Sequence, residues 1–360
     1  MTAAGSAQQL LPMGRSAVAP VEAQGAARDA ARLLVARRSA GTIEHLRLRD
    51  LPEVLASGDA LVVNTSAVLP AALPTSTTDG TPLRLHLSTR DPDRASLSDP
   101  EEASSSEAWL VEVRRPAGLG SSPHLDASEG QVLDLPAGGR ALLRSSASRG
   151  PRGEGVRLWR AHLELPTRVL DYLAAHGSPI RYVDSVRAWP LATYQTVFAA
   201  DPGSAESPSA GRGFTAELVT RLATAGIDVI PVVLHAGVSS QEAGEAPGRE
   251  WHRVSAASAS RIAAARRVVA VGTTSARAVE TAAAGGAVRP SRGWTDLVVS
   301  PASGVGVVDG LLTGWHEPGA SHLDLLETVG GRPLVRASYE AAATAGYRWH
   351  ELGDFHLILP

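Results

Sequence analysis

The stretch VVAVGTTSARAVE, residues 268–280, decides the fold class. Its four apolar residues predict a buried strand, Gly272 predicts a turn, and the residues that follow predict a helix. A strand that passes through a glycine turn into a helix is the repeating unit of α/β folds. The free N–H groups of the helix start, together with the hydroxyls of Thr273, Thr274 and Ser275, predict a cradle for an anionic or polar ligand.

Two charged residues on this predicted helix extend the candidate site. Arg277 and Glu280 are three positions apart and share one helix face, so they can pair with each other or reach a ligand. The spaced glycines and the lysine of a phosphate-binding loop are missing, and so is a dinucleotide-binding fingerprint. An ordinary helix start with a surface ion pair has the same spacing, and both interpretations remain open.

Apolar runs and helical segments alternate outward from this stretch. Predicted strands are 61–63, which ends at Asn64, and 227–235, 267–271, 296–300 and 355–360. Predicted helices are 28–38, 51–56, 167–177, 215–226, 275–284, 321–329 and 336–346. We therefore expect an α/β layered domain whose strands are mostly parallel.

Residues 75–163 have a different character. Short alternating or β-rich runs, such as LRLHL at 83–87 and WLVEV at 109–113, are separated by Ser-, Gly-, Pro- and Asp-rich stretches, with hardly any helical period. We predict a multi-domain α/β protein with a small β-barrel domain at 75–163. This domain is inserted into a discontinuous α/β catalytic domain formed by 1–74 and 164–360.

Composition limits the function classes. A length of 360 residues favours two domains, and the lack of cysteine excludes disulfides, thiolate metal sites and thiol nucleophiles. The sequence contains neither an apolar run near 18 residues nor a secretion signal, so we expect a cytoplasmic protein without a membrane partner. The net charge of −3 leaves any RNA contact to local arginine clusters.

Several polar residues follow or precede predicted strands. His235 ends a strand, His316 and Glu317 lie side by side in LLTGWHEPGASHLDLL, and Asp354 precedes the last strand. Such groups can act as acids and bases or as metal ligands, but metal-binding spacing is absent and we predict no metal. A strand-end histidine and a turn aspartate can also be structural.

The segment TYQTVFAADPGSAESPSAGRGFT, residues 193–215, is a long run of small residues that leads into a helix. Loops of this length in compact domains are usually functional or disordered. Its aromatic and apolar beginning favours an ordered loop, although a plain surface loop remains an alternative.

Seven segments, in this order, resemble the S-adenosylmethionine:tRNA ribosyltransferase-isomerase family of queuosine biosynthesis. They are residues 28–35, 45–73, 194–215, 232–237, 271–280, 307–318 and 338–359. The resemblance implies a monomeric or weakly associated cytoplasmic enzyme that uses S-adenosyl-L-methionine as co-substrate and no metal. The reaction would move the ribosyl moiety onto a 7-aminomethyl-7-deazaguanine base in the anticodon region of tRNA, giving epoxyqueuosine and releasing adenine and methionine.

The sulfonium of the co-substrate acidifies the neighbouring C5′ hydrogens, so a positioned base could start this reaction. The resemblance implies His235, His316 and Asp354 as candidate catalytic groups. Candidate substrate- and S-adenosylmethionine-binding residues are Asn64, Pro208, Ala210, Gly211, Gly272, Thr273, Thr274, Ser275, Arg277 and Glu280.

The sequence also departs from the family pattern. Ala67 and Ala72 stand where the family has arginine, and Gly213 stands where it has histidine. Arginines elsewhere could replace the missing cations, for example Arg181, Arg212 or Arg249. These departures weaken the prediction of a tRNA partner and leave two alternatives: an S-adenosylmethionine-using transferase with a non-tRNA acceptor, or a catalytically silent nucleotide- or RNA-binding relative.

Overall fold

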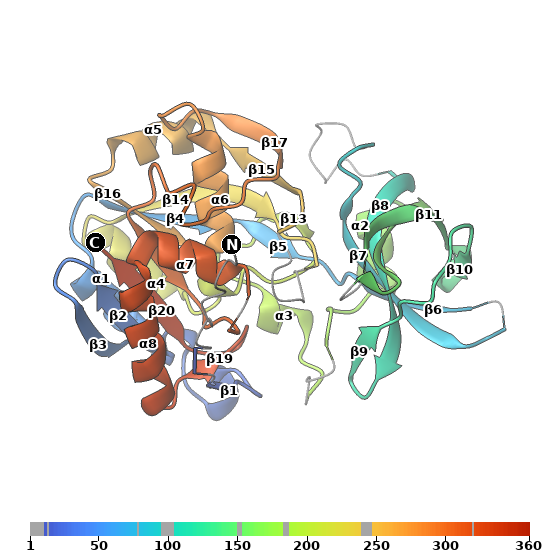
Figure 1. Ribbon diagram of the computed structural model, residues 1–360, viewed down its shortest axis with the longest axis horizontal. Helices are drawn as coiled ribbons and strands as arrows, with labels where there is room; N and C mark the ends of the chain where they lie inside the picture. The colour runs from blue at the N-terminus through green and yellow to red at the C-terminus, as the bar shows by residue number, and fades with distance from the viewer. Residues whose placement is uncertain are drawn as a thin grey trace, which may run out of the picture.

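The computed structural model describes residues 11–12, 14–77, 79–94, 104–149, 153–182, 187–238, 247–318 and 320–360 (Figure 1). The described chain forms a nine-stranded sheet with helices and a seven-stranded sheet, and Figure 1 shows them as a larger and a smaller lobe. The prediction of a mixed α/β fold is confirmed.

The nine-stranded sheet combines parallel and antiparallel strand pairs. In spatial order its strands are β17 (Ser291–Thr295), β15 (Glu250–Val254), β14 (Asp228–His235), β4 (Asp59–Asn64), β16 (Arg267–Val271), β18 (Gly310–Thr313), β20 (Phe355–Leu359), β2 (Arg32–Arg37) and β3 (Thr42–Arg47). The neighbours β14, β4, β16 and β18 run parallel, as do β2 and β20. The remaining pairings are antiparallel, so the sheet is mixed and the expectation of mostly parallel strands was wrong.

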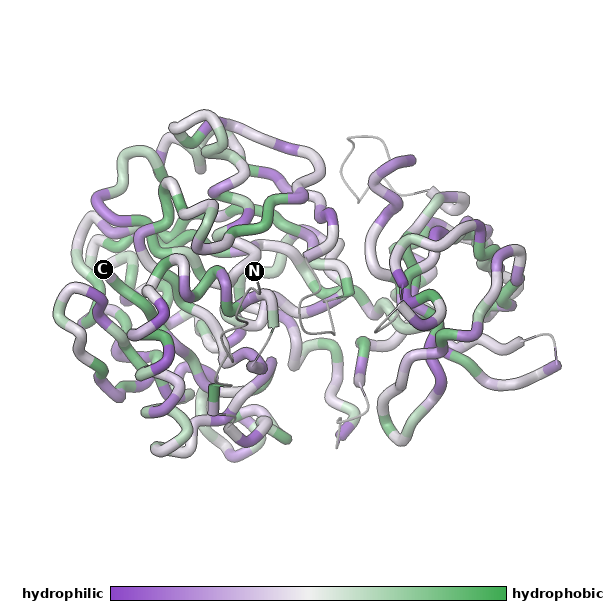
Figure 2. Tube along the Cα trace, in the orientation of Figure 1, coloured by the Kyte–Doolittle hydropathy of each residue, from purple (hydrophilic) through white to green (hydrophobic). Residues whose placement is uncertain are grey.

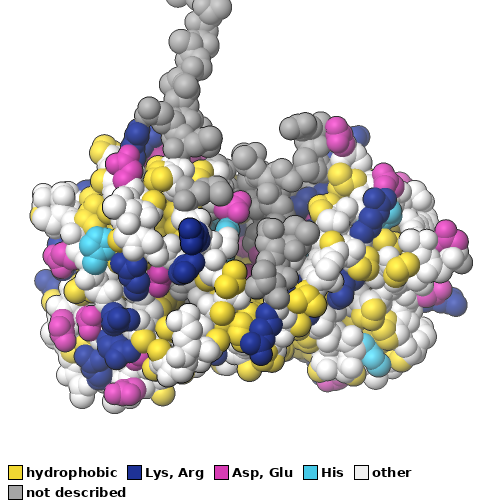
Figure 3. Space-filling model, turned by 90° about the horizontal axis from the view of Figure 1, so that it is seen from below, with side chains coloured by type: hydrophobic (Ala, Val, Ile, Leu, Met, Phe, Trp, Pro, Cys, Tyr) yellow, Lys and Arg dark blue, Asp and Glu magenta, His cyan; other side chains and the backbone are white. Residues whose placement is uncertain are grey.

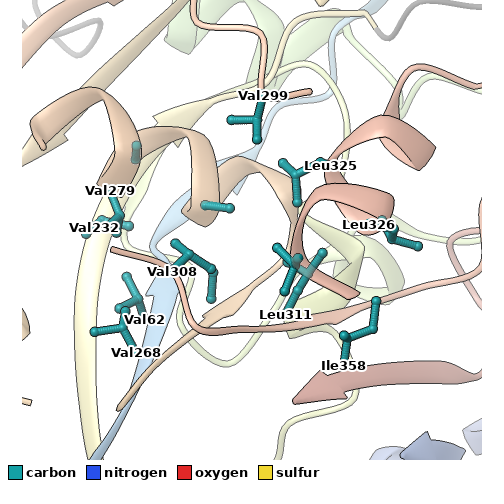
Figure 4. Packing of buried hydrophobic residues seen from close by; sticks show 14 of the residues in the cluster. Val62, Val232, Val268, Val279, Val299, Val308, Leu311, Leu325, Leu326 and Ile358 are labelled. Carbon is teal, nitrogen blue, oxygen red and sulfur yellow. The ribbon is translucent and has the colours of Figure 1, made fainter. Parts of the chain in front are cut away.

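Helices cover both faces of this sheet because its central strands are apolar on both sides. Along β4, Ala60 and Val62 face one core, which also contains residues of α5 (Ala256–Ala264), α6 (Thr273–Ala282), α7 (His322–Gly330) and α8 (Arg332–Thr344). Leu61 and Val63 face a second core with α1 (Leu51–Val54) and α4 (Ala216–Thr224). Successive residues of a strand point to opposite faces, so β4 contributes to both cores. Figure 4 shows Val62 of β4 and Val268 of β16 in the same core as Val279 of α6.

The segment 28–38, predicted as a helix, is a strand. A 3₁₀ turn at Arg28–Ala30 leads directly into β2. Four consecutive residues of β2, from Leu33 to Ala36, are fully buried, and the strand pairs with both β20 and β3. Burial on both faces of a sheet outweighed the helical propensity of its alanine, leucine and arginine residues.

Two further local predictions need correction. Residues 296–300, predicted as a strand, follow β17 and have no regular secondary structure. The helix predicted over 167–177 is α2 (Val169–His176), which begins two residues later, after Arg168, without a side-chain cap. At the start of α4, by contrast, the hydroxyl of Thr215 caps the helix by accepting a hydrogen bond of 3.1 Å from the N–H of Leu218.

The seven-stranded sheet lies in the smaller lobe. In spatial order its strands are β12 (Val156–Glu164), β11 (Arg140–Arg149), β10 (Val132–Asp134), β6 (Ala72–Ser76), β7 (Pro82–Arg90), β8 (Ser106–Ala117) and β9 (Gly120–Pro123). β12, the first strand in this order, also pairs with β8, so the strands from β12 to β8 form a closed ring of pairings. A separate apolar core, which includes Trp109, Trp159 and Tyr172 of α2, fills this lobe. Figure 2 shows apolar segments in the interior of both lobes.

Several short elements lie outside the two large sheets. The segment 193–215 is ordered: it contains β13 (Asp201–Ser204), which pairs with β5 (Ser66–Val68), and a 3₁₀ turn at Ser209–Gly211. α3 (Leu191–Tyr194) ends inside this segment. β1 (Arg15–Ser16) pairs with β19 (Arg348–Trp349). No helix in the described ranges has both the length and the apolar character that crossing a membrane requires.

Candidate functional site

A cavity of about 520 Å³ lies at the carboxyl edge of the parallel strands. Residues that end or directly follow three of these strands line it, namely Ala236 after β14, Gly272 after β16, and Thr313 with Gly314 at the end of β18. The carboxyl edge of parallel strands is the usual position of a ligand in open α/β sheets. Further wall residues come from the segments 16–18, 180–182, 187–194, 206–210, 247–250 and 350–352. Figure 3 shows hydrophobic and arginine side chains gathered on the underside, where the two lobes meet.

The glycine turn after β16 forms one wall of the cavity. Gly272 has a φ of 89° and a ψ of 155°, and its N–H donates a hydrogen bond of 2.7 Å to the carbonyl of Leu312. α6 starts at Thr273 without a side-chain cap, and Thr273 and Thr274 both line the cavity. The start of α6 therefore presents hydroxyls and the positive end of a helix dipole to a ligand.

Asn64 supports this wall from behind. Its Nδ2 donates to the carbonyl of Leu234 at 2.8 Å and to Oγ1 of Thr274 at 3.1 Å. Its Oδ1 accepts hydrogen bonds from the N–H groups of Ser66 and Leu234. Asn64 is buried and does not line the cavity, so its contact with a ligand would run through Thr274.

Arg277 and Glu280 do not pair with each other. Arg277 lines the cavity and forms an ion pair with the carboxylate of Glu250, which also lines it. Arg277 also donates to the carbonyls of Leu297 and Gly248 at 3.0 and 3.1 Å. Burial raises the pKa of Glu250, whereas Arg277 lowers it.

Glu280 instead holds the loop before β18. Its carboxylate accepts three hydrogen bonds of 2.8–3.0 Å from the N–H groups of Gly306, Val307 and Val308. It does not line the cavity. Of the two options that the sequence left open, the ion pair between Arg277 and Glu280 does not form, because each residue has a partner on another segment, and Arg277 reaches the cavity.

A pair of histidines occupies the wall beyond β18. The rings of His316 and His322 stack with centroids 4.5 Å apart, and both line the cavity. Nε2 of His316 lies 2.9 Å from Oγ1 of Thr313. Burial, followed by the neighbouring histidines, lowers the pKa of His316 well below its ordinary value, and burial also lowers the pKa of His322. The lowered pKa values favour the neutral form of both rings.

The other two candidate catalytic groups lie outside the cavity lining. His235 is buried, stacks on Trp251 at a centroid distance of 5.3 Å, and contacts Oγ of Ser66 through Nδ1 at 2.7 Å. Burial lowers the pKa of His235 to about 4. Asp354 accepts hydrogen bonds from the N–H groups of Arg32 and Arg348 at 2.9 and 2.7 Å. In these positions His235 contacts the side chains of Ser66 and Trp251, and Asp354 holds the backbone at Arg32 and Arg348.

The remaining predicted residues divide in the same way. Pro208 and Ala210 line the cavity. Ala210 packs against Gly272: a Cβ added at Gly272 would lie 3.3 Å from the Cβ of Ala210. Gly211 does not line the cavity. Ser275 is buried, and its hydroxyl donates a hydrogen bond of 2.8 Å to the carbonyl of Val271.

The three departures from the family pattern also lie outside the lining. Ala72 is buried in β6, and Ala67 is in β5. A Cβ added at Gly213 would lie 2.4 Å from Leu48 and 2.6 Å from Phe355, so this packing has no room for a side chain there. Of the three replacement cations, Arg181 lines the cavity, whereas Arg212 pairs with Glu22 and Arg249 with Asp93.

Sequence reasoning missed several cavity residues. Tyr182, Trp189 and Glu250 line the cavity but lie in segments without a motif. Glu206 and Glu351 also line it, and their signal was that they lie in the family-like segments 194–215 and 338–359. Among the described residues, no three His, Cys, Asp or Glu side chains converge as a metal site would require.

The fold and the cavity define this chain as a mixed α/β protein with a polar ligand site at the carboxyl edge of its parallel strands. The profile of a family described as "Queuosine biosynthesis protein" matches residues 8–358. The chain belongs to this family.

Two relatives agree with this membership, and one solved structure is similar to this chain. The S-adenosylmethionine:tRNA ribosyltransferase-isomerase of Symbiobacterium thermophilum is 36% identical and the two chains cover 97% of each other. That of Acidithiobacillus ferrooxidans is 37% identical, with 92% of each chain covered. The crystal structure of the S-adenosylmethionine tRNA ribosyltransferase from Thermotoga maritima is 27% identical, with 97% of this chain and 98% of that chain covered and a TM-score of 0.49.

Proposed function

We propose that this protein is a tRNA-modifying transferase-isomerase. It would transfer the ribosyl moiety of S-adenosylmethionine to a 7-aminomethyl-7-deazaguanine base in the anticodon region of tRNA, forming epoxyqueuosine and releasing adenine and methionine. The observation that supports this proposal is convergence on one cavity. Three of the family-like segments, around 208–210, 272–277 and 313–318, are far apart in sequence and line the same space.

The cavity offers a group for each part of this chemistry. The aromatic side chains of Tyr182, Trp189 and Trp315 suit a nucleobase, and the start of α6 suits the polar groups of ribose or a carboxylate. His316, neutral and next to Thr313, is our candidate for the base that takes a C5′ proton from the co-substrate. We assign positioning roles to His235 and Asp354.

The organisation of the chain fits the same proposal. We propose that residues 75–163 form a small barrel inserted into an α/β domain of residues 1–74 and 164–360; the pairing of β12 with both β8 and β11 supports a closed sheet. We also propose that the protein works in the cytoplasm as a monomer or weak oligomer.

The test is turnover with purified protein. S-adenosylmethionine is incubated with tRNA that carries the aminomethyl base and with the same tRNA carrying guanine, and adenine release and epoxyqueuosine are measured by mass spectrometry. Adenine and epoxyqueuosine should form only with the modified tRNA, and His316→Ala should lower the rate by about 100-fold or more. A folded wild-type protein that releases no adenine would contradict the proposal.

The two alternatives give different results in the same assay. A transferase with another acceptor would release adenine with a small amine but not with the modified tRNA. A silent relative would bind ligand without any turnover.

A further inference from the structure

The smaller lobe contacts the wall of the cavity at Tyr182. The guanidinium carbon of Arg114, in β8, lies over the Tyr182 ring, 4.9 Å from its centroid. The ring of His86, in β7, meets the same ring in an edge arrangement at a centroid distance of 6.3 Å. Tyr182 itself is half-buried and lines the cavity. Two strands of the smaller lobe therefore support a ring that forms part of the ligand space.

Arg114 is held firmly in this position. It is buried and donates to the carboxylate of Glu112 at 2.6 Å, to Oγ of Ser121 at 2.9 Å and to the carbonyl of Ser121 at 2.8 Å. The hydrogen bonds of a guanidinium lie in its plane, so its flat face stays available for an aromatic ring. A cation with so many fixed partners gives the Tyr182 ring a rigid surface to pack on.

The neighbouring strand β9 holds the backbone beside the ring. Oγ of Ser121 donates a hydrogen bond of 3.1 Å to the carbonyl of Arg181. A Cβ added at Gly120 would lie 1.8 Å from the carbonyl oxygen of Tyr182. Gly120 does not have a positive φ, so this close approach, and not its backbone conformation, requires a glycine there. Any side chain at position 120 would push Tyr182 away.

The hydroxyl end of the ring is fixed as well. It donates a hydrogen bond to the carboxylate of Glu206, in the loop that follows β13. Arg114 covers one face of the Tyr182 ring and His86 meets its edge, so what the ring offers to the cavity is a flat aromatic surface of fixed orientation. Such a surface suits a planar heteroaromatic ring, which stacks on it.

We infer that a purine-type ring of a reactant stacks on Tyr182, and that Arg114 and Gly120 of the smaller lobe position Tyr182 for this contact. The inference rests on the proposed function, whose two reactants each carry such a ring. These rings are the adenine of S-adenosylmethionine and the 7-deazaguanine of the tRNA. The smaller lobe thereby completes the ligand site of the larger one.

The test detects the contact directly by nuclear magnetic resonance. The chain has five tyrosines, so selective labelling of tyrosine gives few ring signals, and Tyr182→Phe identifies the signal of Tyr182. Nuclear Overhauser effects from this ring to the ligand are measured with S-adenosylmethionine and with an anticodon stem-loop RNA that carries the aminomethyl base. Titration calorimetry gives the dissociation constants of both ligands.

Two variants disturb the ring in independent ways. Arg114→Met removes the cation behind it, and Gly120→Ala displaces its backbone. Their matched controls are Arg115→Met, at an exposed arginine of the same strand, and Gly285→Ala, where an added Cβ meets no atom within 4 Å. Tyr182→Leu removes the aromatic surface itself.

We expect Overhauser effects between Tyr182 and at least one of the two ligand rings. Tyr182→Leu should weaken binding of that ligand by about tenfold, as expected for the loss of one base stacked on an aromatic side chain. Arg114→Met and Gly120→Ala should each weaken it by about threefold or more and reduce the Overhauser effects. Arg115→Met and Gly285→Ala should match the wild type. The ligand that responds identifies the ring that stacks on Tyr182.

Two results would overturn the inference. One is a wild type in which Tyr182 shows no contact with either ligand ring. The other is wild-type affinity for both ligands in folded Arg114→Met and Gly120→Ala proteins. A failure of the proposed function would look different: the contact would be present and sensitive to these substitutions, but the wild type would release no adenine with the modified tRNA.

Discussion

Nδ2 of Asn64 lies 3.1 Å from Oγ1 of Thr274, which joins the end of β4 to the start of α6. The same amide bonds both backbone groups of Leu234 at the end of β14. One side chain thus sets the relative positions of two strand ends and of a hydroxyl that lines the cavity. Ligand binding at this wall therefore depends on a residue that has no direct access to the ligand.

Substitutions at Asn64 and Thr274 should separate stability from binding. Asn64→Ala would leave buried backbone groups without partners, at about 1–3 kcal/mol each, so the free energy of unfolding should fall by about 3 kcal/mol. Thr274→Val keeps the shape and removes one hydroxyl; it should change stability by less than about 1 kcal/mol and weaken S-adenosylmethionine binding severalfold. Urea denaturation and calorimetry measure the two effects. Equal destabilisation by both variants would contradict this division.

The buried ion pair between Arg277 and Glu250 makes a second prediction. Arg277→Met should lower the free energy of unfolding by about 3–5 kcal/mol, because it leaves the carboxylate of Glu250 without its partner. The double variant Arg277→Met/Glu250→Gln should recover most of this loss. Since Arg277 lowers the pKa of Glu250, the single variant should recover stability as the pH falls and Glu250 becomes protonated. A pH-independent loss in urea unfolding would argue against an unpaired charge.

The turn at Gly272 should not tolerate a side chain. Its φ of 89° with a ψ of 155° lies in a region essentially restricted to glycine, and strain there costs about 1–3 kcal/mol. Gly272→Ala should therefore lower the melting temperature and weaken ligand binding. Gly314→Ala is the matched control, since an added Cβ at Gly314 meets no atom within 4 Å. If the two variants have the same melting temperature, backbone strain at Gly272 is not important.

Binding of a cationic ligand should depend on pH through Glu351. Burial raises the pKa of this carboxyl to about 7, Glu206 also raises it, and Arg212 lowers it. As the pH rises from 6 to 8 the group loses its proton and gains negative charge, so affinity for S-adenosylmethionine should rise. Affinity for S-adenosylhomocysteine should change less. Glu351→Gln should remove the difference in slope, and a slope that survives the substitution would assign it to another group.

The sequence predicted the part of the fold that depends on local pattern. The run from Val268 to Glu280 contains its own strand, turn and helix start, and the structure has β16, Gly272 and α6 at these positions. Residues 28–38 were misinterpreted, because nothing local to them shows that β20, more than 300 positions later, pairs with β2. Tertiary burial decided that strand.

The site was predictable to the same extent. The glycine turn, Arg277 and His316 stand out in sequence and line the cavity. Tyr182 and Glu250 line the cavity only after distant segments have folded together, so no local pattern could reveal them. His235 and Asp354 looked like reactive groups because they lie at strand ends, but at those positions they bond to the surrounding chain.

The place of β20 has a consequence for biosynthesis. This strand lies inside the large sheet, between β18 and β2, although it is the last strand of the described chain. During translation β2 and β3 leave the ribosome early. The edge of β2 that pairs with β20 stays open until residues 355–359 have been synthesised. Open strand edges attract other chains, so nascent protein stalled before that point should be the form that chaperones retain and that aggregates most readily.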